Sequence, residues 1–238
     1  MKRISFTFTL LVGIFLCGAC DDGLIPENNV TPQTDGYVAK LTGEITGIRN
    51  WSSQYTVALA GFTDESDYAV VQKNLPSANG TVNMTLSNIP TEATRIELCV
   101  TNSLRKHVVT LASINIADAA GDTIRLDVGE LNASQFNTIQ QQVFNTTCAN
   151  CHGGSTSAAA GLYLTEGKSY DNIVNRESKK APEMMRVLPG DAENSILYQA
   201  LTRDISTDGK WHYDHTTEIV NENILTMISN WINNGATE

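Results

Sequence analysis

The stretch IELCVT at residues 96–101 alternates between apolar side chains and polar or small ones. Successive side chains of a β-strand point to opposite faces, so this period of two predicts a half-buried strand with Ile96, Leu98 and Val100 facing a core. Cys99 is out of phase with that set and is predicted on the other face. A lone cysteine there is typical of inert packing, because no activating neighbour is evident.

The same alternation recurs on both sides of this strand, between breaks rich in Asp, Asn, Ser, Pro and Gly. About seven strands without a long helix predict that residues 36–130 form an all-β sandwich of two sheets, immunoglobulin-like in type. His107 is predicted to be a solvated strand residue and Trp51 a core aromatic. The other clear strands are those of Tyr55, Val57 and Leu59, of Val82, Met84 and Leu86, and of Ile124, Leu126 and Val128.

The first 35 residues are predicted to export and anchor the chain. Lys2 and Arg3 precede an apolar run, which is followed by Gly18, Ala19 and Cys20. This is the pattern of a secretory signal peptide over residues 1–19, and the run is too short to span a bilayer. It resembles the bacterial lipoprotein signal, which implies lipidation of Cys20 and a tether over 20–35. A plain signal peptide cut near Ala19 is the alternative.

Export and lipidation together imply a chain anchored to a bacterial membrane, the outer membrane or cell surface rather than the inner membrane. The 238 residues carry a formal net charge of −10. An acidic surface repels nucleic acid and anionic lipid, so neither is an expected partner of the folded part.

A helix is predicted to begin at Ser134 and to lead into the sequence Cys-Ala-Asn-Cys-His at 148–152. Two thiols at this spacing can bond to the two vinyl groups of a porphyrin, and the histidine that follows is then carried to the iron. Cys148, Cys151 and His152 are therefore predicted to bind one covalent haem c. The predicted helix has apolar residues on one face, namely Phe136, Ile139, Val143 and Phe144.

Other uses of the two cysteines stay open. A thioredoxin-like motif follows a strand and begins a helix, whereas here the predicted helix comes first. A structural zinc site needs a second pair of ligands, which His212 and His215 could supply. An incidental disulfide between Cys148 and Cys151 is a third alternative.

Residues 134–237 resemble the small class I cytochrome c domains appended to exported bacterial proteins. That resemblance implies an all-α cytochrome c-like domain over 131–238, whose first and last helices cross beside the haem. Asp191 is predicted to cap a helix through 196–201, and a closing helix with Val220 and Trp231 on its apolar stripe ends at Gly235. The matching stretches are 143–152, Gly161-Leu-Tyr-Leu164, Val187-Leu-Pro-Gly-Asp-Ala-Glu-Asn-Ser-Ile-Leu-Tyr198 and 228–236.

The chain departs from this family at the sixth iron ligand. The family usually carries Arg-Met-Pro before the closing helix, and that methionine binds iron, but here the segment 210–215 reads KWHYDH. By position His212 is the first candidate for the distal ligand and His215 the second. Met184, Met185 or an open site remain as alternatives. Replacement of methionine by histidine is expected to lower the reduction potential.

The predicted function is transfer of single electrons by a membrane-tethered monohaem protein to a redox partner protein. An alternative is a binding module in which the β domain recognises a protein or glycan and the haem part is a sensing or structural appendage. Enzymatic activity is not predicted, because a filled sixth position leaves no free site on the iron for a peroxide.

Overall fold

The computed structural model describes residues 36–154, 156–206, 209 and 212–238, which belong to one unit over residues 34–238. The predicted signal peptide, Cys20 and the tether lie outside the described residues. Within the described ranges no helix is both long and apolar enough to cross a bilayer.

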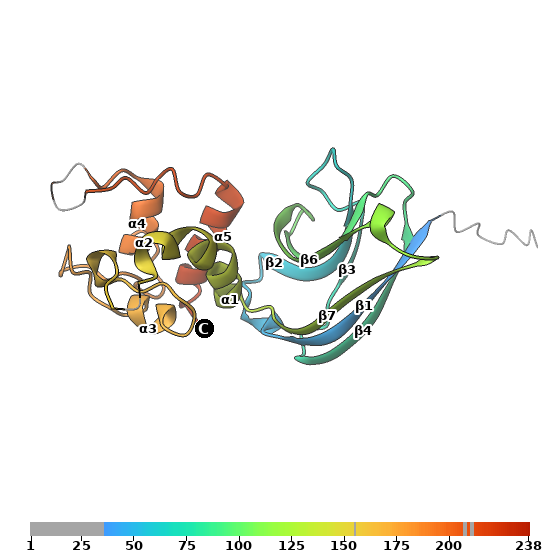
Figure 1. The fold of residues 1–238 in the computed structure, drawn as a ribbon, viewed down its shortest axis with the longest axis horizontal. Coiled ribbons are helices and arrows are strands. Elements are labelled where there is room, and N and C mark those ends of the chain that lie inside the picture. The colour runs from blue at the N-terminus through green and yellow to red at the C-terminus, as the bar shows by residue number, and fades with distance from the viewer. Residues whose placement is uncertain (1–35, 155, 207–208, 210–211) are drawn as a thin grey trace, which may run out of the picture. The chain divides into compact units, whose positions relative to one another are not determined.

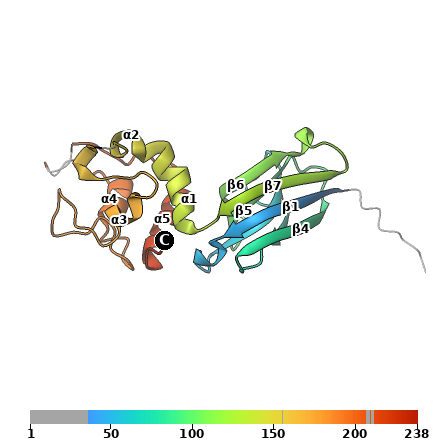
Figure 2. The same ribbon diagram turned by 60° about the horizontal axis from the view of Figure 1, so that its bottom comes forward.

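Seven strands form two sheets (Figures 1 and 2). The three-stranded sheet has the order β4-β1-β7, and the four-stranded sheet has the order β3-β2-β5-β6. Two sheets of seven strands agree with the prediction for residues 36–130. The strands are β1 (Tyr37–Thr46), β2 (Tyr55–Phe62), β3 (Val71–Asn74), β4 (Gly80–Ile89), β5 (Arg95–Asn102), β6 (His107–Asn115) and β7 (Thr123–Asn132).

The immunoglobulin-like arrangement is wrong. That fold pairs its first, second, fifth and fourth strands in one sheet and its third, sixth and seventh in the other. Here β1 lies between β4 and β7, antiparallel to the first and parallel to the second. Leu41 on β1 is thereby opposite Met84 and Leu126. Alternation along single strands does not determine which strands pair, so the sequence pattern could not reveal this order.

The centre of the four-stranded sheet is β5, whose two faces are both buried. Leu98 is paired with Leu59 of β2 and belongs to the main core together with Ile96 and Val100. Cys99 is fully buried in a second cluster on the opposite face, with Ala60, Phe62 and Ala69. The predicted placement of Cys99 on the face opposite to Leu98 is confirmed. The strand was predicted to be half-buried, but both of its faces are buried.

The all-α cytochrome c-like domain predicted for 131–238 is wrong. The described structure is mainly β-sheet, and the helices after β7 are short, the longest being α5 with 12 residues. Turns, loops and isolated bridges occupy much of the chain from 162 to 221. The helical segments are α1 (Gln135–Ile139), η3 (Gln140–Cys148), α2 (Ala149–His152), η4 (Ala159–Gly161), α3 (Ser169–Ile173), α4 (Ile196–Thr202) and α5 (Glu222–Asn233); η1 (Ile48–Asn50) and η2 (Ile116–Asp118) adjoin the strands.

Side chains that bond to the nearby backbone explain why long helices do not form here. Oδ1 of Asp191 accepts from the amide of Asn194, and Oδ1 of Asp214 accepts from the amide of Thr216. Such local bonds offer the backbone an alternative to helical hydrogen bonds. Asp191 therefore closes a turn and does not cap α4, whose N-cap residue is Ser195.

The first and last helices after the sandwich agree better with prediction. The helix begins at Ser134 as predicted, and the Ser134 hydroxyl caps α1 by accepting from the amide of Asn137. The chain then continues through η3, a π-helical stretch of a kind uncommon in proteins and frequent at functional sites. In α5 the side chain of Trp231 is buried, but Val220 lies before the helix and is 85% exposed.

Candidate functional site

The Cys-Ala-Asn-Cys-His motif lies at the end of a helical path that begins at Gln135. Cys148 is the last residue of η3, and Cys151 and His152 end α2. Cys148 and Cys151 are three residues apart, which is close to one helical turn, so their side chains project from successive turns of the same segment. Cys148 is half-buried, Cys151 is exposed, and both are free thiols.

Burial makes Cys148 a poor acid. Removal from water raises the pKa of the Cys148 thiol to about 11, and the negative charge of Glu218 acts in the same direction. The thiol is consequently protonated at neutral pH. Glu218 belongs to the segment that follows His215, so this segment approaches the motif.

His152 is held in one orientation from two sides. Its Nδ1 lies 3.0 Å from the carbonyl oxygen of Ala159, and its own carbonyl accepts from the amide of Leu164 at 2.8 Å. A carbonyl only accepts, so Nδ1 carries the proton, and in the neutral ring the lone pair is on Nε2. Histidines that bind metals are commonly fixed by such a bond from the second ring nitrogen.

The surroundings of His152 favour the neutral imidazole. Burial lowers the pKa of His152, and electrostatic interaction with His215 and Arg186 also lowers it, whereas bonding to the backbone of Ala159 and Leu162 acts in the opposite direction. Neutral imidazole is the form that binds iron. The donor set of two thiols and one neutral histidine in sequence therefore fits covalent haem.

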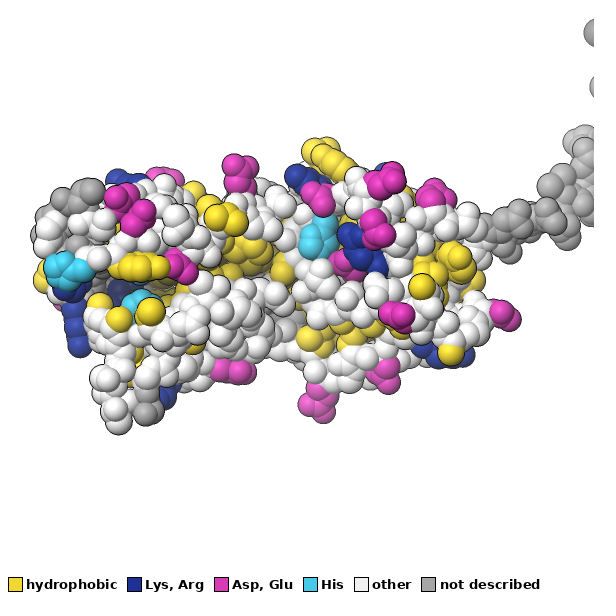
Figure 3. All heavy atoms as spheres, turned by 45° about the horizontal axis from the view of Figure 1, so that its top comes forward, with side chains coloured by type: hydrophobic (Ala, Val, Ile, Leu, Met, Phe, Trp, Pro, Cys, Tyr) yellow, Lys and Arg dark blue, Asp and Glu magenta, His cyan; other side chains and the backbone are white. Residues whose placement is uncertain are grey.

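The ring that lies against His152 is that of His215. Their centroids are 6.3 Å apart and their planes are inclined by 24°. Nδ1 of His215 is buried without a hydrogen-bond partner. His212, by contrast, is exposed. Figure 3 shows histidine side chains reaching the surface of the C-terminal part of the chain, near acidic and hydrophobic ones.

The other predicted ligands are placed differently. Met184 and Met185 lie half-buried in a segment closed by backbone bonds, such as that from the Met184 amide to the Ala181 carbonyl. For the zinc alternative, the described residues contain no group of three or more His, Cys, Asp or Glu side chains that could hold a metal ion. A four-ligand site of Cys148, Cys151, His212 and His215 is therefore not formed in this conformation.

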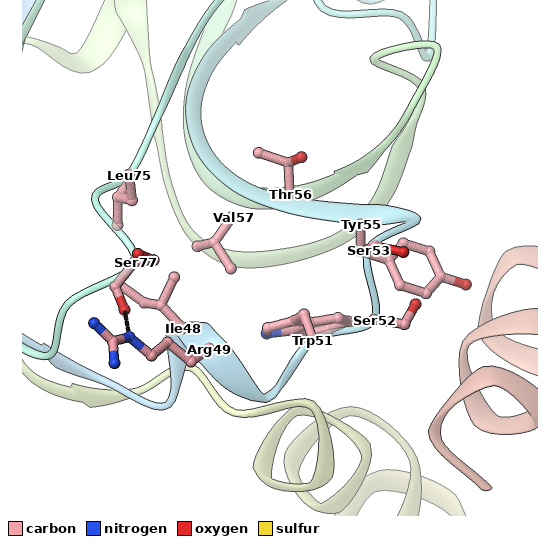
Figure 4. A pocket seen from close by; sticks show the side chains of 10 residues that line it. All are labelled: Ile48, Arg49, Trp51, Ser52, Ser53, Tyr55, Thr56, Val57, Leu75 and Ser77. Carbon is pink, nitrogen blue, oxygen red and sulfur yellow. Dashed lines mark hydrogen bonds between the residues drawn. The ribbon is translucent and has the colours of Figure 1, made fainter. Parts of the chain in front are cut away.

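A second candidate site is a cavity of about 360 Å³ beside β2 (Figure 4). Its wall includes the rings of Trp51 and Tyr55, which meet edge to face with centroids 5.7 Å apart. Arg49 lies at its rim and donates through Nε to the carbonyl of Ser77 at 2.8 Å. The Trp51 indole donates to the Ala133 carbonyl, so this predicted core aromatic is half-buried and lines the cavity.

One polar cluster was missed by the sequence reasoning. Glu97 on β5 is 4% exposed, and its Oε1 accepts from Nε of Arg95 at 2.7 Å. Its Oε2 accepts from the Thr110 hydroxyl at 2.7 Å and lies 3.1 Å from Nε2 of His107. His107 is thus not the solvated residue predicted. The cluster joins β5 to β6, and only the pairing of these strands reveals it. It has no described link to the Cys148–His152 segment.

Comparison of the chain with protein-family models, curated proteins and solved structures finds no match.

Proposed function

We propose that this chain is a c-type haem protein that transfers single electrons to a redox partner protein while a lipid anchor on Cys20 tethers it to a bacterial membrane. The haem would be bound covalently through Cys148 and Cys151, and His152 would bind the iron on one side. The observation that carries the proposal is the His152 orientation, because Nδ1 is bonded to the Ala159 carbonyl and Nε2 is left as the nitrogen that can bind iron, one residue after Cys151.

Each residue of the motif has a distinct role in this proposal. The thiol of each cysteine would add across one vinyl double bond of the porphyrin, forming a thioether with no leaving group. His152 would donate its Nε2 lone pair to iron while Ala159 keeps the ring oriented. The bound iron would supply reversible one-electron chemistry. The resemblance to the cytochrome c family rests on the motif and its flanking sequence, and not on the overall fold.

The test is intact-protein mass spectrometry of the chain produced together with haem-maturation machinery. The expected mass is that of the protein plus one haem, which remains attached after denaturation and acid-acetone extraction. Cys148→Ala and Cys151→Ala should each leave one thioether at most, and the double variant should carry none. Cys99→Ala is the matched control and should keep full attachment, because Cys99 lies inside the sandwich. Wild-type protein that never acquires the added mass contradicts the proposal.

The alternative function is binding of a glycan or protein by the β part, and the cavity beside β2 favours it. Pockets that combine aromatic walls with a few polar groups are common ligand sites. Titration of the haem-free chain with oligosaccharides, followed by intrinsic tryptophan fluorescence, tests this alternative. A saturable change that Arg49→Ala abolishes would support it, and no change across a panel of sugars would count against glycan binding.

A further inference from the structure

We propose that His215 is the second axial ligand of the haem iron, so that His152 and His215 bind one iron from opposite sides. This inference rests on the proposed function, since it needs the haem held by Cys148 and Cys151. It deepens that function by assigning the distal ligand. Sequence position alone favoured His212 for this role, with His215 second.

The separation of the two rings is the first argument. A histidine nitrogen lies about 2 Å from a bound transition-metal ion, and the centre of the ring lies about 1 Å beyond that nitrogen. Two imidazoles on opposite sides of one ion therefore have ring centroids about 6 Å apart. The centroids of His152 and His215 are 6.3 Å apart. The spacing is the one that shared ligation requires. Offset aromatic pairs also have centroids about 4.5–7 Å apart, so the spacing alone does not distinguish ligation from packing, and the choice of ligation rests on the second argument as well.

The unsatisfied nitrogen is the second argument. Nδ1 of His215 is buried and has no partner among the described residues. A buried polar atom without a partner costs about 1–3 kcal/mol, and native proteins keep few of them. The His215 ring lies beside His152 of the haem-attachment motif. A haem bound there would give the His215 ring a partner that the haem-free structure lacks.

The loop around His215 is built to hold that ring. Its carbonyl accepts from the amide of Glu218, and the side chain of Asp214 accepts from the amide of Thr216 at 2.9 Å. The ring of Tyr213 meets that of His215 edge to face at 4.9 Å, and the Tyr213 hydroxyl is bonded to Glu218. These bonds fix the backbone on both sides of His215, and the Tyr213 ring packs against its imidazole, so the ring is placed while its Nδ1 is left without a partner.

His212 lacks these features. It is exposed, and it lies before the turn that Asp214 and Glu218 close. The two histidines are three residues apart in the chain, so each serves as the matched control for the other.

The test uses full-length haem-loaded protein and its optical and electron-paramagnetic spectra. Wild-type protein is expected to be low-spin when ferric, to lack the charge-transfer band of methionine ligation, and to bind no carbon monoxide when ferrous. His215→Ala should become high-spin and bind carbon monoxide stoichiometrically. His215→Met should restore a low-spin iron, show the methionine band and raise the midpoint potential. His212→Ala should keep every wild-type property.

Carbon monoxide binding by the wild-type protein, a methionine band in its spectrum, or an open site in His212→Ala but not in His215→Ala would each overturn the assignment. The mass of each sample separates this failure from that of the proposed function. Protein that carries covalent haem but binds carbon monoxide overturns only the role of His215. Protein without covalent haem overturns both.

Discussion

The ring of Phe136 in α1 lies against that of Trp231 in α5, with centroids 5.3 Å apart and planes inclined by 32°. The same pair of helices is joined by a hydrogen bond of 3.0 Å from the Gln135 side chain to the Met227 carbonyl. Segments almost a hundred residues apart thereby support the start of the helical path that ends at Cys148. The stability of the motif thus depends on the last helix of the chain.

Trp231→Ala is expected to lower the free energy of unfolding by about 3–5 kcal/mol, since it removes a fully buried aromatic side chain and leaves a cavity. Chemical denaturation followed by circular dichroism measures the change. Val220→Ala is the control, because Val220 is 85% exposed and its loss should cost less than about 0.5 kcal/mol. Similar losses in the two variants would contradict the packing described for α5.

Ser134→Ala is expected to lower the free energy of unfolding by about 1 kcal/mol, because it removes the side-chain oxygen that accepts from the Asn137 amide. Ser134→Asp should retain most of the stability, since aspartate is an equally good N-cap residue. The measurement is the denaturant midpoint at constant slope. An aspartate variant as unstable as the alanine variant would show that packing of Ser134, and not capping, matters.

Glu97 is expected to make the sandwich less stable in acid. Burial alone would raise the pKa of Glu97, but hydrogen bonds from His107, Thr110 and Arg95 outweigh it and lower the pKa to about 2. A depressed pKa stabilises the fold above the ordinary carboxylate range, and this contribution disappears as the pH falls from about 5 to about 2. Thermal unfolding measured across this range should show the loss.

The variant that tests this contribution is Glu97→Gln. It is expected to lower the free energy of unfolding by about 3 kcal/mol at pH 7 and by progressively less towards pH 2. Glu44→Gln is the control: Glu44 is an exposed carboxylate bonded to Thr81, and its replacement should change stability by less than about 0.5 kcal/mol at any pH. A pH-independent cost for Glu97→Gln would mean that the carboxylate charge is not what stabilises β5 and β6.

In haem-free protein, Cys148 is expected to react with iodoacetamide about tenfold more slowly than a small thiol of ordinary pKa. Its raised pKa of about 11 reduces the thiolate fraction, and the greater intrinsic nucleophilicity of the thiolate recovers only part of the loss. Peptide mapping after timed alkylation gives the rate. Cys99 should stay unmodified until the protein unfolds, because burial also raises its pKa. Reaction of Cys148 at the rate of the free thiol would contradict its burial.

Local sequence signals were sufficient where neighbours along the chain set the structure. Alternation assigned Leu98 and Cys99 to opposite faces of β5, and Ser134 marked the start of α1, because both effects act over a few residues. After residue 152 the helices expected at 196–201 and before Gly235 do form, as α4 and α5, but the all-α domain expected around them does not. There, helix-like apolar spacing competes with side chains such as Asp191 and Asp214 that bond to the backbone and favour turns.

The sequence by itself determined the spacing of Cys148, Cys151 and His152, which is a covalent property of the chain and carries the proposal of haem attachment. It also determined the faces of the strands, since their period of two is local. Tertiary structure alone decided which sheet each strand joins, that Glu97 is buried beside His107, and that His215 rather than His212 lies against His152. The reason is physical: these contacts join segments far apart in the chain, and their geometry depends on how the intervening loops fold.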